Sequence, residues 1–120
     1  MAETRFTLHF IHIENPLKNL SSIGELKKYL FPDMIMPERH KHLEGEAKLL
    51  HDKGYFVIGY MEWTIFEIAL HSRGMEEFFT DLSSDPKFAE YLLEKICENR
   101  CFQSKRFAET GVDMICTGYE

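Results

Sequence analysis

The chain has 120 residues, of which 44% are hydrophobic and 28% are charged, and its net charge is -6. This composition predicts one globular domain and excludes a disordered chain. The negative charge, without a cluster of Lys and Arg, argues against nucleic-acid binding. Apolar runs are far shorter than the ~20 residues that span a bilayer, so we expect no membrane segment. An odd count of three cysteines favours the cytoplasm over a disulfide framework.

The N-terminal part, residues 1–36, is predicted to contain one strand and one short helix. Polar and apolar residues alternate over 5–10, as in a half-exposed strand, and Ile11 and Ile13 extend it after a phase change that indicates a bulge. The capping-box spacing of Ser22 and Glu25 then predicts a helix over 22–30. The Phe-Pro-Asp run at 31–33 ends that helix.

The rest of the chain, residues 37–120, repeats a helix followed by an apolar strand. Pro37 is expected to open a helix that Gly54 closes, and residues 55–60 follow as a strand without polar alternation, which is typical of a strand buried on both faces. Two further helices are predicted over 64–71 and 75–82. They provide ample chain for a right-handed crossover to the next strand.

The last predicted helix and strand have the clearest boundary signals in the sequence. Asp85 is a suitable N-cap, Pro86 suits the first helical position, and Gly111 can adopt the left-handed conformation that ends a helix. A break near residues 103–105 would shorten this long helix. A strand over 112–117 follows. The predicted apolar face of the helix comprises Phe88, Ala89, Leu92, Leu93, Ile96, Cys97, Cys101 and Ala108.

A helix followed by an apolar strand occurs twice in the sequence, and this order predicts an α/β fold with parallel strands. Such strands need neighbours on both sides to satisfy their backbone groups, and the sequence ends before supplying another.

Residues 73–115, RGMEEFFTDLSSDPKFAEYLLEKICENRCFQSKRFAETGVDMI, resemble the middle of the uroporphyrinogen decarboxylase superfamily, which includes corrinoid-linked methyltransferases. The resemblance extends over residues 15–120, and the order and spacing of its short motifs make it specific. The upstream motifs are Asn15-Pro16-Leu17, the 22–29 helix, Phe31-Pro32-Asp33, and Phe66-Glu67 before Arg73-Gly74.

The resemblance implies a partial TIM barrel with parallel strands and long flanking helices, since a complete barrel needs about 250 residues. Residues 1–120 would form one partial domain containing the third and fourth barrel strands. A truncated gene, a shortened chain, or a natural half-barrel that assembles with another copy or partner would each explain the length. Open sheet edges favour a homo-oligomer formed through these edges or through the long helix.

In such barrels the chemistry lies at the carboxyl ends of the strands. This rule places Glu62 and Trp63 after the first strand, and Tyr119 and Glu120 after the second, as substrate-binding or catalytic candidates. Glu120 can bind substrate or act as an acid or base, but a solvated terminal acid is the competing interpretation.

Glu67 and His71 are four residues apart on a predicted helix, so they form either a catalytic pair or a surface ion pair. Arg73 either grips a substrate carboxylate in a bidentate manner or positions the loop before the next helix.

The sequence also departs from the family pattern. The arginine-bearing loop and early aspartate that the decarboxylases use to grip the tetrapyrrole are absent, and Ile68 stands near an expected tyrosine. The branch is therefore more similar to the methyltransferases. Their zinc ligands would lie beyond Glu120, so we expect no cofactor in this chain, while the parent family uses zinc with a corrinoid protein or no cofactor.

Local metal binding is not favoured either. His40 and Glu44 can ligate, but His40 and His42 lie on different helical faces and no HExxH pattern occurs. Cys97 and Cys101 share the apolar face, where thiols act as small hydrophobic groups.

Two functional hypotheses remain. In the first, the chain is a segment of a decarboxylase-like or methyltransferase-like enzyme and is inactive alone. In the second, it is a free-standing oligomeric module that binds a small molecule or a protein.

Overall fold

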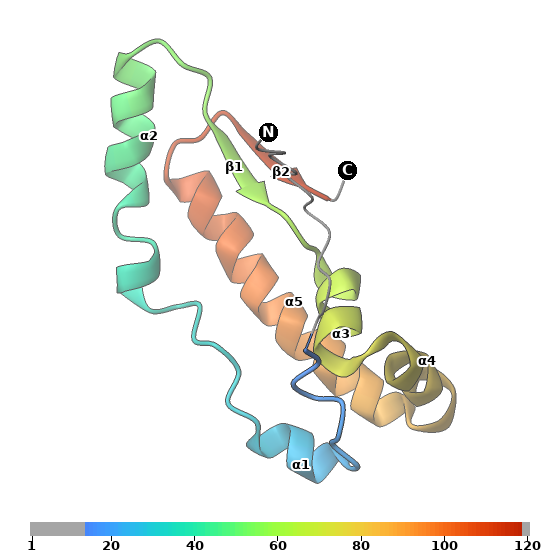
Figure 1. Cartoon of the computed structure of the whole chain (residues 1–120). Coiled ribbons are helices and arrows are strands. Elements are labelled where there is room, and N and C mark those ends of the chain that lie inside the picture. Colours follow the sequence, from blue (N-terminus) through green and yellow to red (C-terminus); the bar gives the residue numbers. More distant parts are fainter. Residues whose placement is uncertain (1–13, 119–120) are drawn as a thin grey trace, which may run out of the picture.

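The computed structural model describes residues 14–118, which form a mixed α/β structure of α-helices and two parallel strands (Figure 1). The predicted strand and bulge over residues 5–13, together with Tyr119 and Glu120, lie outside the described residues. The elements are α1 (Ile23–Lys28), the 3₁₀ helix η1 (Pro37–Arg39), α2 (Leu43–Asp52), β1 (Ile58–Met61), α3 (Ile65–Arg73), α4 (Met75–Ser84), α5 (Pro86–Glu109) and β2 (Met114–Thr117).

The two strands pair in parallel, as predicted. Ile58 is opposite Met114 and Met61 is opposite Thr117. Within the described residues the sheet contains β1 and β2 alone and does not close into a barrel. The crossover between them runs through α3, α4 and α5.

The predicted ends of the long helix are confirmed. The Asp85 side chain accepts a hydrogen bond from the Phe88 backbone N–H at 3.3 Å, Pro86 is the first helical residue, and Gly111 follows the helix with a φ of 84°. The helix is continuous over 24 residues, so the break near residues 103–105 that the sequence analysis considered does not occur. Its length of about 36 Å lets it join the two ends of the structure.

Two helix boundaries differ from the prediction. Pro37 begins only a 3₁₀ turn, because His40 adopts an extended φ of -141° that ends it, and the α-helix starts at Leu43. The first helix ends at Lys28 rather than Leu30, since Tyr29 is already in the β region. The helices predicted over 64–71 and 75–82 are α3 and α4.

A closed apolar core occupies one end of the structure. We call this end the helical half: α1, α3, α4 and the N-terminal part of α5, with the preceding loop at 15–20. Phe78 and Leu26 have no solvent exposure. The core comprises Leu17, Leu26, Ala69, Phe78, Phe88, Ala89, Leu92 and Ile96.

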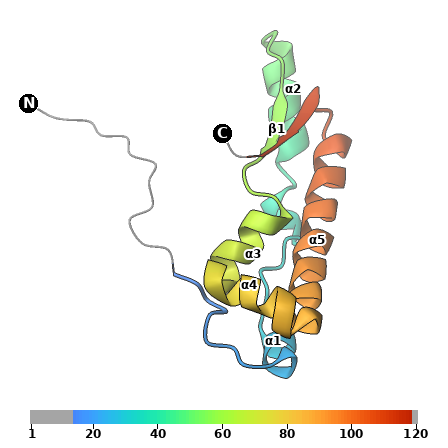
Figure 2. The same ribbon diagram turned by 90° about the vertical axis from the view of Figure 1, so that its right-hand side faces the viewer.

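The other end, which we call the sheet half, contains α2, β1, β2 and the C-terminal part of α5. Figure 2 shows α5 on one side of the two strands. Gly59 lies so close to this helix that a Cβ atom there would be 2.8 Å from Cδ1 of Phe107. The close approach explains why β1 has no side chain at this position.

The prediction that both faces of the strands are buried is wrong for the described residues. Along β1, exposed and buried residues alternate, because α5 covers one face of the strand only. Ile58 and Tyr60 are 48% and 54% exposed on the opposite face, which we call the open face. Phe56 and Met114 extend it, by strand alternation and by pairing with Ile58.

Within residues 14–118, no helix has the length and apolar character needed to cross a bilayer.

Candidate functional site

The carboxyl ends of β1 and β2 lie side by side, as the parallel pairing requires. Tyr60, near the end of β1, donates its hydroxyl hydrogen bond to the carbonyl of Gly118 beyond β2, at 3.1 Å. Glu62, the predicted rim residue, follows β1 directly and is exposed. A carboxylate is therefore available at this rim.

Trp63 and His71 come together across α3. Their rings stack with centroids 4.3 Å apart and an interplanar angle of 24°. Because Trp63 precedes α3 and His71 lies in its last turn, the stack fixes the chain between β1 and α3 against the helix. It brings one predicted substrate-binding residue to one predicted catalytic residue.

Glu67 is held mainly by the start of its own helix. Its carboxylate accepts a hydrogen bond from the Thr64 hydroxyl, and Thr64 is the N-cap residue of α3. This hydrogen bond is the main reason why the pKa of Glu67 is below its ordinary value, and the nearby His71 lowers that pKa further. The carboxylate is therefore stabilised as an anion, which suits electrostatic interaction better than proton donation.

A hollow of about 380 Å³ lies between the strand ends and α5. Trp63 lines it, and two cationic side chains, Arg100 and Lys105, come from the helix. The remaining lining residues are Met61, Thr64, Ile65, Cys101, Ser104 and Thr117. The rim thus combines an apolar surface with positive charge, an arrangement that can hold an organic anion.

Glu62 and Tyr60 instead border a neighbouring hollow of about 310 Å³ beside β1. It also contains His40 and Arg106, whose side chains hydrogen-bond at 2.7 Å between Nδ1 and Nε. Arg106 pairs in addition with Glu44 at 2.5 Å, and this hydrogen bond is the main cause of the lowered pKa of Glu44. These bonds tie η1 and α2 to α5.

Arg73 is 7% exposed and far from being a free substrate-binding group. Its Nε and Nη2 donate to the two carboxylate oxygens of Asp81 at 2.7 and 3.1 Å. Its Nη1 donates to three backbone carbonyls, and its guanidinium lies 4.4 Å from the ring centre of Phe88. The carbonyl acceptors belong to Leu17, Lys18 and Leu20.

Arg73 fixes the 15–20 loop onto α3 and α4, which is neither of the two roles predicted for it, since the loop predicted for positioning is the one before α4. The bidentate partner predicted for it is Asp81 of the same chain. Sequence reasoning missed Asp81, although an Asp eight residues after an Arg, on a face with Phe78, was a visible signal.

A polar pair at the opposite ends of the strands was also missed. The Asp113 carboxylate accepts a hydrogen bond from the Val57 backbone N–H and contacts His51 Nε2, both at 2.7 Å. The Val57 hydrogen bond is the main cause of the lowered pKa of Asp113. Because Asp113 N–H also donates to the Val57 carbonyl, this residue closes the amino end of the sheet.

The cysteine interpretation needs correction. Cys101 is exposed and Cys97 is only partly buried, with their sulfur atoms 3.8 Å apart. Beyond Ile96, the α5 side chains Arg100, Gln103 and Phe107 are only partly buried. Arg100 and Gln103 line a cavity next to α3, and Phe107 packs against Gly59 of β1. Arg100, which is not part of the predicted apolar face, is a functional candidate that the sequence analysis missed.

No group of three or more His, Cys, Asp and Glu side chains within residues 14–118 is arranged to hold a metal ion. Comparisons with protein-family models, with curated proteins and with solved structures found no match for this chain.

Proposed function

We propose that the chain is a segment of a βα-barrel of the uroporphyrinogen decarboxylase superfamily, closer to its methyltransferase branch. In this proposal β1 and β2 correspond to two neighbouring barrel strands. The parent activity is decarboxylation of a tetrapyrrole or corrinoid-linked methyl transfer. The isolated chain is inactive, because the other strands that would enclose the substrate belong to further copies or to a partner.

The observation that carries the proposal is the parallel pairing of β1 with β2 over a helical crossover, with α5 on one face only. Parallel strands occur almost entirely in sheets that are covered on both faces. A pair of strands by itself is also marginally stable in water. The local structure therefore has the features of part of a larger sheet.

The dimensions support the same interpretation. The radius of gyration is 17.7 Å, and the principal extents are 52 × 45 × 22 Å. A compact domain of about 100 residues has a radius of gyration near 13 Å. The flat, open shape leaves the apolar open face available to a second copy of the chain.

The proposed chemistry lies at the carboxyl ends of the strands. Glu62 and Trp63 provide a carboxylate and an aromatic surface there, and Tyr119 and Glu120, outside the described residues, are proposed to complete the rim. His71 stacks on Trp63 and positions the indole ring, and the anionic Glu67 holds the start of the same helix through Thr64. Arg73 contributes indirectly by holding the loop at 15–20.

The proposed association is tested by placing a charge on the open face. Ile58→Asp should abolish chemical cross-linking between copies, because the buried carboxylate would lose its hydration. Leu30→Asp is the matched control, since Leu30 is 90% exposed on a segment far from the strands. Equal cross-linking of Ile58→Asp and the wild type would contradict association through this face.

The proposed chemistry is tested by turnover assays of the isolated chain. One assay supplies uroporphyrinogen and measures loss of carboxyl groups, and the other supplies methylcobalamin and a thiol and measures thioether formation. The expected result is no turnover in either assay. Detectable turnover by a monomeric chain would overturn the claim that the active site is incomplete.

A further inference from the structure

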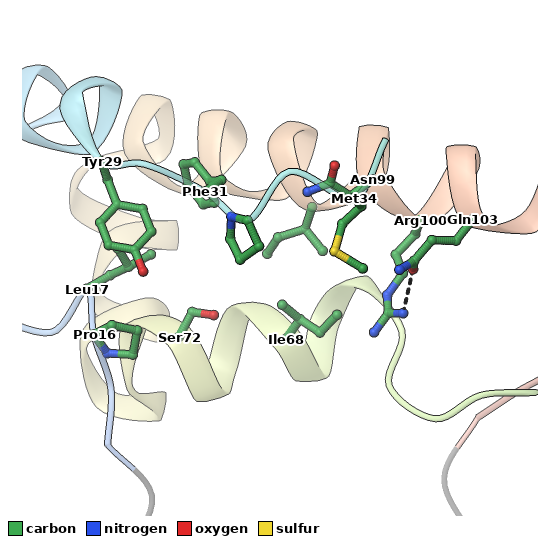
Figure 3. A pocket seen from close by; sticks show the side chains of 12 residues that line it. Pro16, Leu17, Tyr29, Phe31, Met34, Ile68, Ser72, Asn99, Arg100 and Gln103 are labelled. Atoms are coloured by element: carbon green, nitrogen blue, oxygen red, sulfur yellow. Dashed lines mark hydrogen bonds between the residues drawn. The ribbon is translucent and has the colours of Figure 1, made fainter. Parts of the chain in front are cut away.

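A separate cavity of about 320 Å³ lies in the helical half, between α3, α5 and the extended segment 29–34 (Figure 3). No strand residue lines it, and Arg100 is the one lining residue that it shares with the hollow at the strand ends. We call it the Arg100 pocket. It is lined by Pro16, Leu17, Tyr29, Phe31, Pro32, Met34, Ile68, Ser72, Ile96, Asn99, Arg100 and Gln103.

Most of the pocket wall is apolar. Aromatic rings of Tyr29 and Phe31, packed edge to face at 5.0 Å, lie on one side, and Ile68 of α3 lies on the other. The polar side chains of Asn99, Arg100 and Gln103 gather at one end. An apolar body with a few convergent polar groups is the usual composition of a small-molecule site.

Arg100 is the one charged residue among those that line this pocket. Its Nη1 donates to the Gln103 side-chain carbonyl at 2.8 Å, whereas its Nε is buried and has no hydrogen-bond partner within the described residues. Burial also lowers the pKa of Arg100 below its ordinary value. Because a guanidinium stays protonated in proteins, the structure holds a charged donor that lacks an acceptor.

An unsatisfied buried donor is unfavourable and is rare in folded proteins. Arg73 offers a comparison within the same chain. There the Nε and one Nη bind both oxygens of a carboxylate from the side. The corresponding edge of Arg100, where Nε lacks an acceptor, has the donor geometry that fits such a carboxylate.

We propose that the Arg100 pocket binds a small monocarboxylate with an apolar body. The carboxylate pairs with the Nε edge of Arg100, and the hydrocarbon or aromatic part lies against Phe31, Met34 and Ile68. Arg100, the single cationic side chain of the pocket, balances the single negative charge of a monocarboxylate. A phosphate dianion is disfavoured, since no second cationic side chain lines the pocket. The volume is at the lower end of the ~300–1,000 Å³ range of ligand pockets, which limits the ligand to a small molecule.

The test is calorimetric titration of the full chain with sodium decanoate, and with decanol as the neutral probe of equal chain length. Wild type is expected to bind decanoate at least about tenfold more tightly than decanol. Arg100→Gln should reduce decanoate affinity roughly 10- to 100-fold, the range expected when a charged hydrogen bond is lost, and leave decanol unchanged. Arg39→Gln removes an exposed arginine outside the pocket and should bind like wild type.

A second variant keeps the test decisive if Arg100→Gln does not fold. Ser72→Leu fills the pocket from α3 while leaving Arg100 in place, so it should abolish binding of both probes. Circular dichroism confirms the fold of each variant. Undiminished decanoate binding by Arg100→Gln or Ser72→Leu, or no decanoate binding by the wild type at millimolar concentration, would overturn the proposal.

Discussion

The helical half of the chain is closed around a buried core, whereas the sheet half leaves large apolar side chains exposed. In the helical half, large side chains such as Phe78 and Phe88 are fully buried, and each guanidinium nitrogen of the enclosed Arg73–Asp81 pair is hydrogen-bonded. In the sheet half, Phe56, Ile58 and Tyr60 are about half exposed or more. Residues 14–118 therefore contain both a closed core and an apolar face that no other described residue covers.

The difference shows how helices and parallel strands depend on their surroundings. A helix satisfies its own backbone and needs only one apolar face covered. A parallel strand needs partners at both edges and cover on both faces. The described segment contains enough sequence for the first requirement and not for the second. Substitutions in the two halves should consequently differ in cost.

The largest contrast is expected between two phenylalanines. Phe78→Ala should lower the free energy of unfolding by about 3–5 kcal/mol, because it leaves a cavity in a closed core. Phe56→Ala, at a side chain that is 68% exposed, should change it by less than about 0.5 kcal/mol. Urea unfolding followed by circular dichroism measures both. Equal losses would show that the two halves are equally well packed.

The next largest loss of stability is expected at the buried ion pair of Arg73 and Asp81. Asp81→Ala leaves the Arg73 guanidinium without its carboxylate, and we expect a loss of about 3 kcal/mol in the same unfolding experiment. Asp52→Ala breaks an exposed pair with Lys48 and should cost less than about 1 kcal/mol. A small effect at Asp81 would mean that the three carbonyl acceptors are sufficient to hold Arg73.

A smaller effect tests the contact between α5 and the sheet. Gly59→Ala places a methyl group against the ring of Phe107, and this overpacking should cost about 1–3 kcal/mol. Gly45→Ala in α2 has open space around the added methyl group and should stabilise the chain by about 0.5–1 kcal/mol, since alanine favours helices. If Gly59→Ala is also stabilising in thermal unfolding, α5 does not pack on β1 as described.

The smallest effect concerns pH. The folded pKa of Asp113 lies below its unfolded value near 3.8, so its contribution to stability is present above that value and is lost as pH falls through the folded pKa. Asp113→Asn should therefore reduce the drop in melting temperature between pH 6 and pH 3. Glu25, Glu44 and Glu67, whose pKa values are also lowered, would maintain the rest of the drop. If the melting temperature of Asp113→Asn falls as much as that of the wild type, the Asp113 carboxylate does not stabilise the sheet.

The sequence predicts those features that local chemistry determines. Asp85, Pro86 and Gly111 mark the ends of α5 because capping depends on the residue types at the termini themselves. The parallel pairing of β1 and β2 was predictable since a helix between two apolar strands leaves few other arrangements.

The features that the sequence did not predict depend on contacts with residues that are far away in the sequence. The alternating exposure of β1 reflects which face α5 covers, and an apolar run alone cannot show that. Arg100 is absent from the predicted apolar face of α5 because only tertiary packing brings α3 and the segment 29–34 around its partly buried side chain. Asp81 and Asp113 were missed for the same reason, since their partners lie on other elements.

The most direct test of the central claim is the mass of the chain in solution, measured by sedimentation equilibrium from micromolar to millimolar concentration. If β1 and β2 belong to a sheet that further copies complete, the mass should rise with concentration to twice 14.2 kDa or more. A well-folded particle that keeps the monomer mass of 14.2 kDa throughout this range would contradict the claim.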